Sequence, residues 1–278
     1  MPDIGFSLQA QYDRPMTQVI ALLKECGFSA VSPLWSPECD LASLADCVYS
    51  HKMTIQSLHA PHKGIASLWQ PDSPESKQVQ ENILACLKSC KEFDVPIMVL
   101  HGWHGLIYTF PETPLDFRFF DRIVEQAGEL GVAVAFENIE GEEYLQALMA
   151  RYSELPHIGY CWDSGHDHCY PHKTDFLEAY GHRLIMTHLN DNLGPRTPGG
   201  IPSTMDDLHF LPYDGNINWT TSIEKLKKAP RQSILNFELK VQSHSKDPAD
   251  LIYTSLSLPQ FLHTAGDRAR AIANLYDT

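Results

Sequence analysis

The sequence predicts an α/β fold, a single-domain (β/α)8 TIM barrel. Strand-like apolar runs alternate with helix-like amphipathic runs along the whole chain, eight times in all. The chain has 278 residues, close to the ~250 residues typical of such barrels. It contains no linker-like or low-complexity segment and no short-period repeat. We therefore expect one barrel domain spanning residues 1–278.

The first four strand–helix units are read from apolar runs and helix stops. The helix expected at 16–26 is closed by Gly27, and the one at 116–130 by Gly131, as glycine commonly does. The helix at 75–93 carries apolar residues at helical spacing, and the strand at 96–100 is apolar throughout, as where both faces are buried. The expected strands are residues 4–8, 28–31, 53–58 and 96–100, followed by helices at 16–26, 41–51, 75–93 and 116–130.

The last four strand–helix units follow the same alternation, with a long loop after the seventh strand. In the strand at 132–136, Ala133 and Ala135 share the face of the following Glu137, which leaves room inside the barrel. Asn218 is expected to cap the helix at 220–228, and residues 195–207, rich in Pro and Gly, form a long surface loop. The expected strands are residues 132–136, 158–162, 184–187 and 233–237, followed by helices at 142–152, 175–180, 220–228 and 259–276.

Composition and charge narrow the class of protein. Hydrophobic residues make up 43% and charged residues 20% of the chain, a composition that fits a globular protein. The formal net charge of −14 disfavours nonspecific binding to nucleic acid or to anionic membranes. No apolar run is long enough to span a bilayer. The seven cysteines form no Cys-x-x-Cys pair and are expected to be reduced thiols of a cytoplasmic protein.

Each expected strand from the third to the eighth ends in a residue type that binds metals. Active sites of such barrels lie at these carboxyl ends, and crowding imidazoles and carboxylates together is unfavourable unless cations hold them. The pattern therefore predicts a divalent metal site at the mouth of the barrel. The candidate ligands are His59, His101, Glu137, Asp163, His188 and Glu238 at the strand ends, with His166, Asp207 and His209 on the segments beyond.

Asp163 and His166 illustrate the alternative that each position carries. Both are expected to serve as metal ligands, with His166 on a loop. Taken alone, the stretch is better explained by Asp163 as a cap for the following turn or helix and by His166 as a polar loop residue. The repetition of the pattern on six successive strands is what favours the metal site.

With these motifs, the sequence resembles the xylose-isomerase-like barrel superfamily, which contains sugar and sugar-phosphate isomerases and epimerases and the endonuclease IV group of DNA-repair enzymes. The resemblance covers nearly the whole chain. It rests on Phe-Glu-Asn at 136–138, Asp-Ser-Gly-His at 163–166, His-Leu-Asn-Asp at 188–191, Asp207-x-His209 with Gly-Asn-Ile at 215–217, and Phe-Glu at 237–238.

The resemblance implies how the ligands are shared. In the isomerases and epimerases, one metal is held by residues that match Glu137, Asp163, His188 and Glu238. In the endonucleases, a three-zinc cluster adds residues that match His59, His101, His166, Asp207 and His209. All nine residue types are present here, so the ligand set does not separate the two groups. We expect one tightly held ion, zinc or manganese, at the four-residue site, and up to three ions in all.

Other features favour the isomerases. After Asn138 the chain is acidic and turns straight into a helix, whereas the endonucleases carry a polar, glycine-rich loop there that enters DNA. Basic residues near the expected mouth are sparse, chiefly Lys63, Arg196 and Lys240. Aromatic residues are expected there instead: Trp35, Trp69, Trp103 and Tyr108. Aromatic rings suit the C–H surfaces of sugars, though core packing explains each of these residues equally well.

The sequence thus predicts a metal-dependent sugar or sugar-phosphate isomerase or epimerase that works through an ene-diolate. By the resemblance, Glu137 and Glu238 both bind metal and exchange the substrate proton. His62, Trp103 and Lys240 are candidate substrate contacts, and surface salt bridges explain His62 and Lys240 equally well. The expected partner is a small sugar, with no nucleic acid and no membrane, and a homo-oligomer is one option. The alternative function is an endonuclease IV-like phosphodiester hydrolase acting on abasic DNA.

Overall fold

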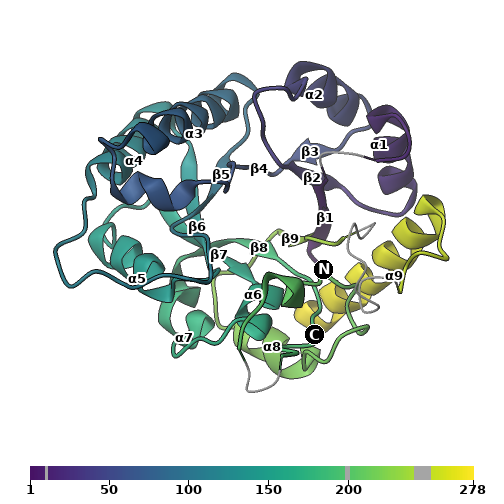
Figure 1. The fold of residues 1–278 in the computed structure, drawn as a ribbon. Helices are drawn as coiled ribbons and strands as arrows, with labels where there is room; N and C mark the ends of the chain where they lie inside the picture. Colours follow the sequence, from purple (N-terminus) through teal and green to yellow (C-terminus); the bar gives the residue numbers. More distant parts are fainter. Residues whose placement is uncertain (10–11, 198–200, 241–251) are drawn as a thin grey trace.

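The strands form a parallel ring, and the helices pack around its outside (Figure 1). The computed structural model describes residues 1–9, 12–197, 201–240 and 252–278. The strands are β1 (Asp3–Leu8), β2 (Ala30–Pro33), β3 (Thr54–Ile55), β4 (Ser57–His59), β5 (Ile97–His101), β6 (Ala133–Glu137), β7 (Ile158–Asp163), β8 (Leu184–His188) and β9 (Ile234–Phe237).

Most connections between strands are helical. The α-helices are α1 (Met16–Glu25), α2 (Leu41–Ser50), α3 (Pro74–Glu92), α4 (Arg118–Leu130), α5 (Glu142–Arg151), α6 (Ser164–Cys169), α7 (Phe176–Tyr180), α8 (Trp219–Leu226) and α9 (Leu258–Asp277). Short 3₁₀ turns are η1 (Ile65–Trp69), η2 (Gly181–Arg183) and η4 (Thr204–Asp206). The last of these lies in the predicted loop 195–207, of which residues 198–200 are outside the described part of the chain.

Two parallel sheets meet edge to edge to close the barrel. One sheet has the order β3-β2-β1-β9 and the other the order β4-β5-β6-β7-β8. Parallel bridges join them at both seams, Leu34 to His59 and Leu189 to Phe237. The predicted third strand is interrupted at Gln56, so that it contributes β3 to one sheet and β4 to the other. The TIM barrel predicted from the sequence is confirmed.

The interior of the barrel below the mouth is filled by small and medium side chains. Val99, Ala135, Cys161 and Met186 form a buried cluster inside strands β5 to β8. Ala135 lies two residues before Glu137 on the same face of β6, and it is fully buried. The carboxylate of Glu137 therefore projects above a packed floor.

The helix ends follow the local chemistry of the sequence, with one correction. Asn218 caps α8 by accepting a hydrogen bond from the backbone of Thr221, as predicted. The prediction of a loop after Asp163 is wrong, because this segment forms α6. The Asp163 carboxylate accepts a 2.7 Å hydrogen bond from the backbone N–H of His166, which starts the helix and fixes His166 on it.

Among the helices of the described residues, none combines the length and apolarity needed to cross a membrane.

Candidate metal centre

The predicted ligands meet at the carboxyl ends of the strands. β4 to β8 end in five of them, and the sixth, Glu238, follows β9 directly. The parallel register places His101 beside Glu137 and Asp163 beside His188. Five of the six residues are buried, and Glu238 is half-buried. The alternation of strand and helix thus delivers side chains distant in sequence to one place.

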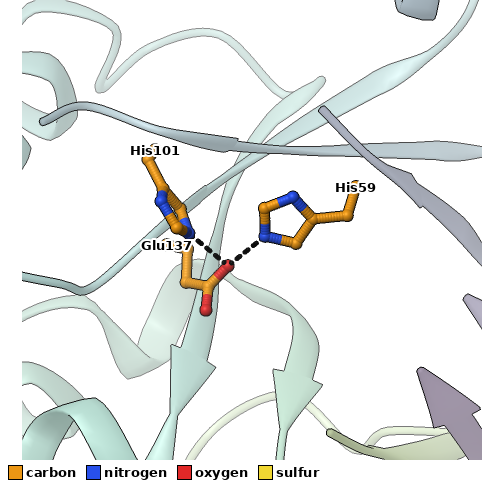
Figure 2. A group of neighbouring side chains, drawn as sticks. All are labelled: His59, His101 and Glu137. Carbon is orange, nitrogen blue, oxygen red and sulfur yellow. Dashed lines mark hydrogen bonds and ion pairs between the residues drawn. The ribbon is translucent and has the colours of Figure 1, made fainter. Parts of the chain in front are cut away.

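Glu137 is the hub of this arrangement. One carboxylate oxygen, Oε2, lies 3.2 Å from His59 Nε2 and 3.1 Å from His101 Nε2, as Figure 2 shows. The other oxygen, Oε1, lies 3.0 Å from His188 Nδ1. A carboxylate that faces imidazoles through both oxygens can bridge two metal ions.

Glu137, Asp163, His188 and Glu238 form the four-residue group. Each offers a ligand atom, and these atoms all lie within 4.8 Å of one another. His188 Nδ1 lies between two carboxylates, 3.0 Å from Glu137 and 2.9 Å from Glu238. The group combines one imidazole with three carboxylates, a donor set that suits zinc or manganese.

Two further groups flank the first. His59, His101 and Glu137 form one of them, and His166, Asp207 and His209 the other, each with ligand atoms within 4.8 Å. His209 Nε2 lies 2.9 Å from Asp207 Oδ2, and His166 Nε2 lies 3.6 Å from the same oxygen. All nine residues predicted as ligands are therefore brought together.

The orientation of the histidines fits a metal. In His59, His166 and His209, Nδ1 lies at hydrogen-bond distance from a backbone carbonyl, which makes it the protonated donor and leaves Nε2 to face a carboxylate. A lone pair opposed to a carboxylate is unfavourable unless a cation, either a proton or a metal ion, lies between them. The three carbonyls belong to Ala60 (2.7 Å), Asn138 (2.9 Å) and Glu238 (3.0 Å), respectively.

Two orphaned atoms point to the same conclusion. His101 Nδ1 and Asp207 Oδ1 are buried and have no hydrogen-bond partner among the described residues. Both belong to predicted ligands: Asp207 Oδ1 has a free lone pair, and no partner of His101 Nδ1 fixes the tautomer of that ring, whose Nε2 faces Glu137. The donor set of this structure therefore fits bound divalent cations.

Electrostatics at the site are dominated by competition between burial and charge. Burial works against ionisation of Glu238, but His188 and His209 together outweigh it and lower the pKa of Glu238 to about 2. Burial likewise opposes protonation of His209, yet Asp207 raises the pKa of that imidazole to about 9. For Asp163, burial prevails and raises the pKa to about 6. Without a metal, the positive charge of protonated histidines balances the negative charge of the carboxylates.

Asn138 and Asn190 hold Asp163 in place, a role that we did not predict. Asn138 accepts a 2.8 Å hydrogen bond from the Asp163 N–H and donates one of 2.8 Å to its carbonyl. The Asn190 amide donates to both carboxylate oxygens of Asp163. The signal was present in the sequence, because Asn138 directly follows Glu137 and Asn190 lies two residues after His188.

The candidate metal-binding groups open into a cavity of about 800 Å³. Of the three predicted substrate contacts, His62 and Lys240 line it and Trp103 does not. The wall opposite Glu137 presents hydroxyl, amide and carboxylate groups that we did not predict, because they form no metal-ligand pattern. These are Ser7, Gln9, Tyr12, Asp13 and Ser32, and His104 also lines the cavity.

The prediction of aromatic side chains at the mouth is corrected by their packing. Trp103 stacks on Tyr144 with ring centroids 4.3 Å apart and an interplanar angle of 5°. Its indole donates to the Gly105 carbonyl. Trp35 and Trp69 are buried in the core, so core packing accounts for all three tryptophans.

A comparison with family models matches residues 20–258 to the xylose isomerase-like TIM barrel. The chain belongs to this family. One curated relative is the uncharacterized protein y4fM of Sinorhizobium fredii, 31% identical over 164 residues. That match covers 55% of this chain and 49% of the relative, so the chain spans about half the relative's length.

Solved structures with a similar fold cover nearly the whole chain. A D-tagatose 3-epimerase-like protein superposes with a TM-score of 0.70 at 20% identity, covering 99% of this chain and 98% of its own. D-psicose 3-epimerase from Clostridium cellulolyticum gives 0.69 at 14%, covering 99% of both chains. An AP endonuclease of family 2 from Brucella melitensis gives 0.62 at 15%, covering 92% and 98%. At such identities the likeness establishes the fold, and activity has to be argued from the site.

Proposed function

We propose that the protein is a divalent-metal-dependent sugar isomerase or epimerase. The observation that carries the proposal is the four-residue group, two of whose members, Glu137 and Glu238, line a cavity large enough for a monosaccharide. The opposite wall offers hydroxyl, amide and carboxylate groups, which complement the hydroxyls of a sugar. The epimerases among the structural neighbours agree with this proposal.

Glu137, Asp163, His188 and Glu238 would hold the principal ion, with zinc or manganese as the proposed metal. When bound, a divalent cation supplies positive charge that stabilises the ene-diolate formed when a proton leaves the carbon beside a carbonyl. The second and third groups would hold further ions.

Glu137 and Glu238 are the proposed acid and base. Both line the cavity, and both face His188, which favours their ionised forms. The Glu238 side chain is 27% exposed, whereas that of Glu137 is fully buried. Glu238 is therefore the carboxylate with freer access to a substrate proton.

His62 and Lys240 are the proposed contacts for substrate hydroxyls. Burial lowers the pKa of His62 to about 4, so the imidazole is neutral near pH 7 and can both donate and accept a hydrogen bond. Lys240 contributes a side chain to the same cavity. Trp103 has no place in this set, because it packs outside the cavity wall.

One observation favours a second candidate, hydrolysis of phosphodiesters in abasic DNA. The two flanking groups would allow three ions, and clustered ions can activate water and stabilise the leaving oxygen. Against it, Lys240 is the only Lys or Arg that lines the described cavity, beside four carboxylates. Arg196 forms an ion pair with Asp206, and Lys63 is exposed.

The proposal is tested by incubating the metal-loaded protein in deuterated water with ketoses, inositol-derived ketones and sugar phosphates. We expect deuterium at the carbon beside the carbonyl of one substrate, together with its isomer or epimer. A metal-loaded protein that exchanges no proton in any member of such a panel, while incising abasic DNA, would instead support the hydrolase.

A further inference from the structure

His209 occupies a backbone conformation that its own side chain disfavours. Its φ is +49°, and Tyr213, four residues later, has a φ of +76°. Residues other than glycine seldom adopt such left-handed values, and in a bulky residue such as Tyr213 the surrounding structure has to hold them. The segment that carries Asp207 and His209 therefore needs an external anchor.

Asp191 provides that anchor through its backbone. Its N–H donates to the Phe210 carbonyl at 2.8 Å, and its own carbonyl accepts from the Phe210 N–H at 2.9 Å. This antiparallel bridge fixes the position of Phe210, the residue directly after His209. It ties the segment to the chain that continues beyond β8.

The carboxylate of Asp191 holds the remainder of the segment. It is fully buried and accepts four hydrogen bonds, which satisfy both of its oxygens. Oδ2 accepts from Tyr213 N (2.8 Å) and from the Trp219 indole (2.9 Å), and Oδ1 accepts from Asn192 N (2.8 Å) and Ile217 N (3.1 Å).

Gly215 is required by the same contact. A Cβ atom at this position would lie 2.2 Å from Asp191 Oδ1 and 2.3 Å from the Asn192 carbonyl oxygen. Neither atom can retreat easily, because one belongs to the buried carboxylate and the other to the backbone. The glycine in the Gly-Asn-Ile motif thus gives the Asp191 carboxylate its space.

The four-residue group has backbone anchors of its own, in addition to the bond between the His209 imidazole and the Glu238 carbonyl. His188 is held by its register with Asp163 on β7. Leu189, the next residue, bonds through its backbone to Asn236 and Glu238 at the end of β9. These ladder contacts do not involve the Asp191 carboxylate.

We infer that Asp191 is a positioning residue for the His166–Asp207–His209 group and not for the four-residue group. The inference rests on the proposed metal centre. Asp191 does not touch the ion site; it acts by fixing the segment that presents Asp207 and His209. Loss of its carboxylate should therefore weaken one metal site selectively.

The test is zinc titration of the chelator-treated full chain against a chromophoric competitor, with circular dichroism to verify folding. We expect Asp191→Asn to lose one bound ion per chain, or to bind it at least tenfold more weakly, while the ion at the four-residue group stays bound. Asp207→Ala should have the same stoichiometry, and adding Asp191→Asn to Asp207→Ala should change zinc binding no further.

Asp214→Asn is the matched control, because this carboxylate lies on the same segment but bonds to Tyr253 and Arg268. It should keep native zinc binding. Gly215→Ala disturbs the Asp191 carboxylate while keeping all of its donors, and it should reproduce the selective loss even if Asp191→Asn fails to fold.

Three results would overturn the inference: native zinc stoichiometry and affinity in both folded variants, equal loss at both sites, or equal loss in the Asp214→Asn control. A native chain that binds one zinc ion, unaffected by Asp207→Ala, would overturn the inference and leave the proposed function standing. A native chain that binds no zinc or manganese would overturn the proposed function itself.

Discussion

Asn190 donates hydrogen bonds to both carboxylate oxygens of Asp163, at 3.1 and 3.0 Å. Both side chains are fully buried. The contact fixes the plane of the Asp163 carboxylate, and space for it depends on Gly165, where a Cβ would lie 1.8 Å from the Asn190 oxygen. A carboxylate oriented in this way is preorganised to bind a metal.

Replacing Asn190 should therefore weaken metal binding. We expect Asn190→Ala to lower the affinity of the four-residue group roughly 10- to 100-fold, the usual effect of losing such an orienting partner. Metal competition with a chelator measures it. Asn82→Ala, on α3 and outside the cavity lining, is the control and should bind as the native protein does. Unchanged affinity in Asn190→Ala would show that the strand alone orients Asp163.

Glu238→Gln should remove turnover and keep the fold. The amide is nearly isosteric but cannot exchange a proton, and general acid–base catalysis typically contributes about 10²- to 10⁴-fold. We expect kcat to fall by that order, and Glu137→Gln to behave likewise. Glu224→Gln, on exposed α8, should leave kcat unchanged. A Glu238→Gln enzyme with near-native kcat at saturating metal would exclude this residue from the chemistry.

The metal-free protein should lose stability as the pH rises from about 6.5 to about 9. Asp207 raises the pKa of His209 to about 9 in the folded state, above the ordinary value of about 6.5. A raised pKa stabilises the fold below the unfolded value, and this stabilisation, at most about 3 kcal/mol, is lost as the pH passes the folded value.

Denaturant unfolding of the chelated protein across this range measures the effect. His209→Asn should show a shallower fall in the free energy of unfolding, and metal-loaded native protein should also be less sensitive, because the metal replaces the proton. If the native and His209→Asn proteins, both freed of metal by a chelator, show identical pH dependence, the assignment of the raised pKa to His209 is wrong.

Duplex DNA with one abasic site should not be incised at catalytic enzyme concentrations. Binding to duplex DNA depends on Lys and Arg side chains that displace counterions, and the described cavity is lined by one lysine and four carboxylates. Gel analysis of a labelled duplex, at low and moderate salt, measures incision. Multiple turnovers that disappear in Glu137→Gln would make the hydrolase the better assignment.

The fold and the set of residues that meet at the mouth could be predicted because they follow from local patterns. Alternating apolar runs fix the strands, and a strand end followed by His, Asp or Glu identifies residues such as His101 and Glu137 directly. The parallel register then brings those ends together without further information. The roles proposed for these residues remain predictions.

The rest depended on contacts between distant segments. Nothing in the local sequence distinguishes Trp103, which stacks on Tyr144, from a tryptophan that faces a substrate. Tyr12 and Ser32 line the cavity because of the path of β1 and β2 rather than any motif. The sequence offers helix capping by Asp163 as an alternative to metal binding, whereas in the structure its carboxylate caps α6 and also faces the other predicted ligands.

The most direct measurement is anomalous scattering from a crystal grown with saturating zinc or manganese, recorded on both sides of the metal absorption edge. We predict an ion within bonding distance of Glu137, Asp163, His188 and Glu238, with their ligand atoms about 2.0–2.2 Å away for zinc. Further peaks beside His59 and His101, and beside Asp207 and His209, would establish the cluster. A metal-replete crystal with no ion at the four-residue group would contradict the account.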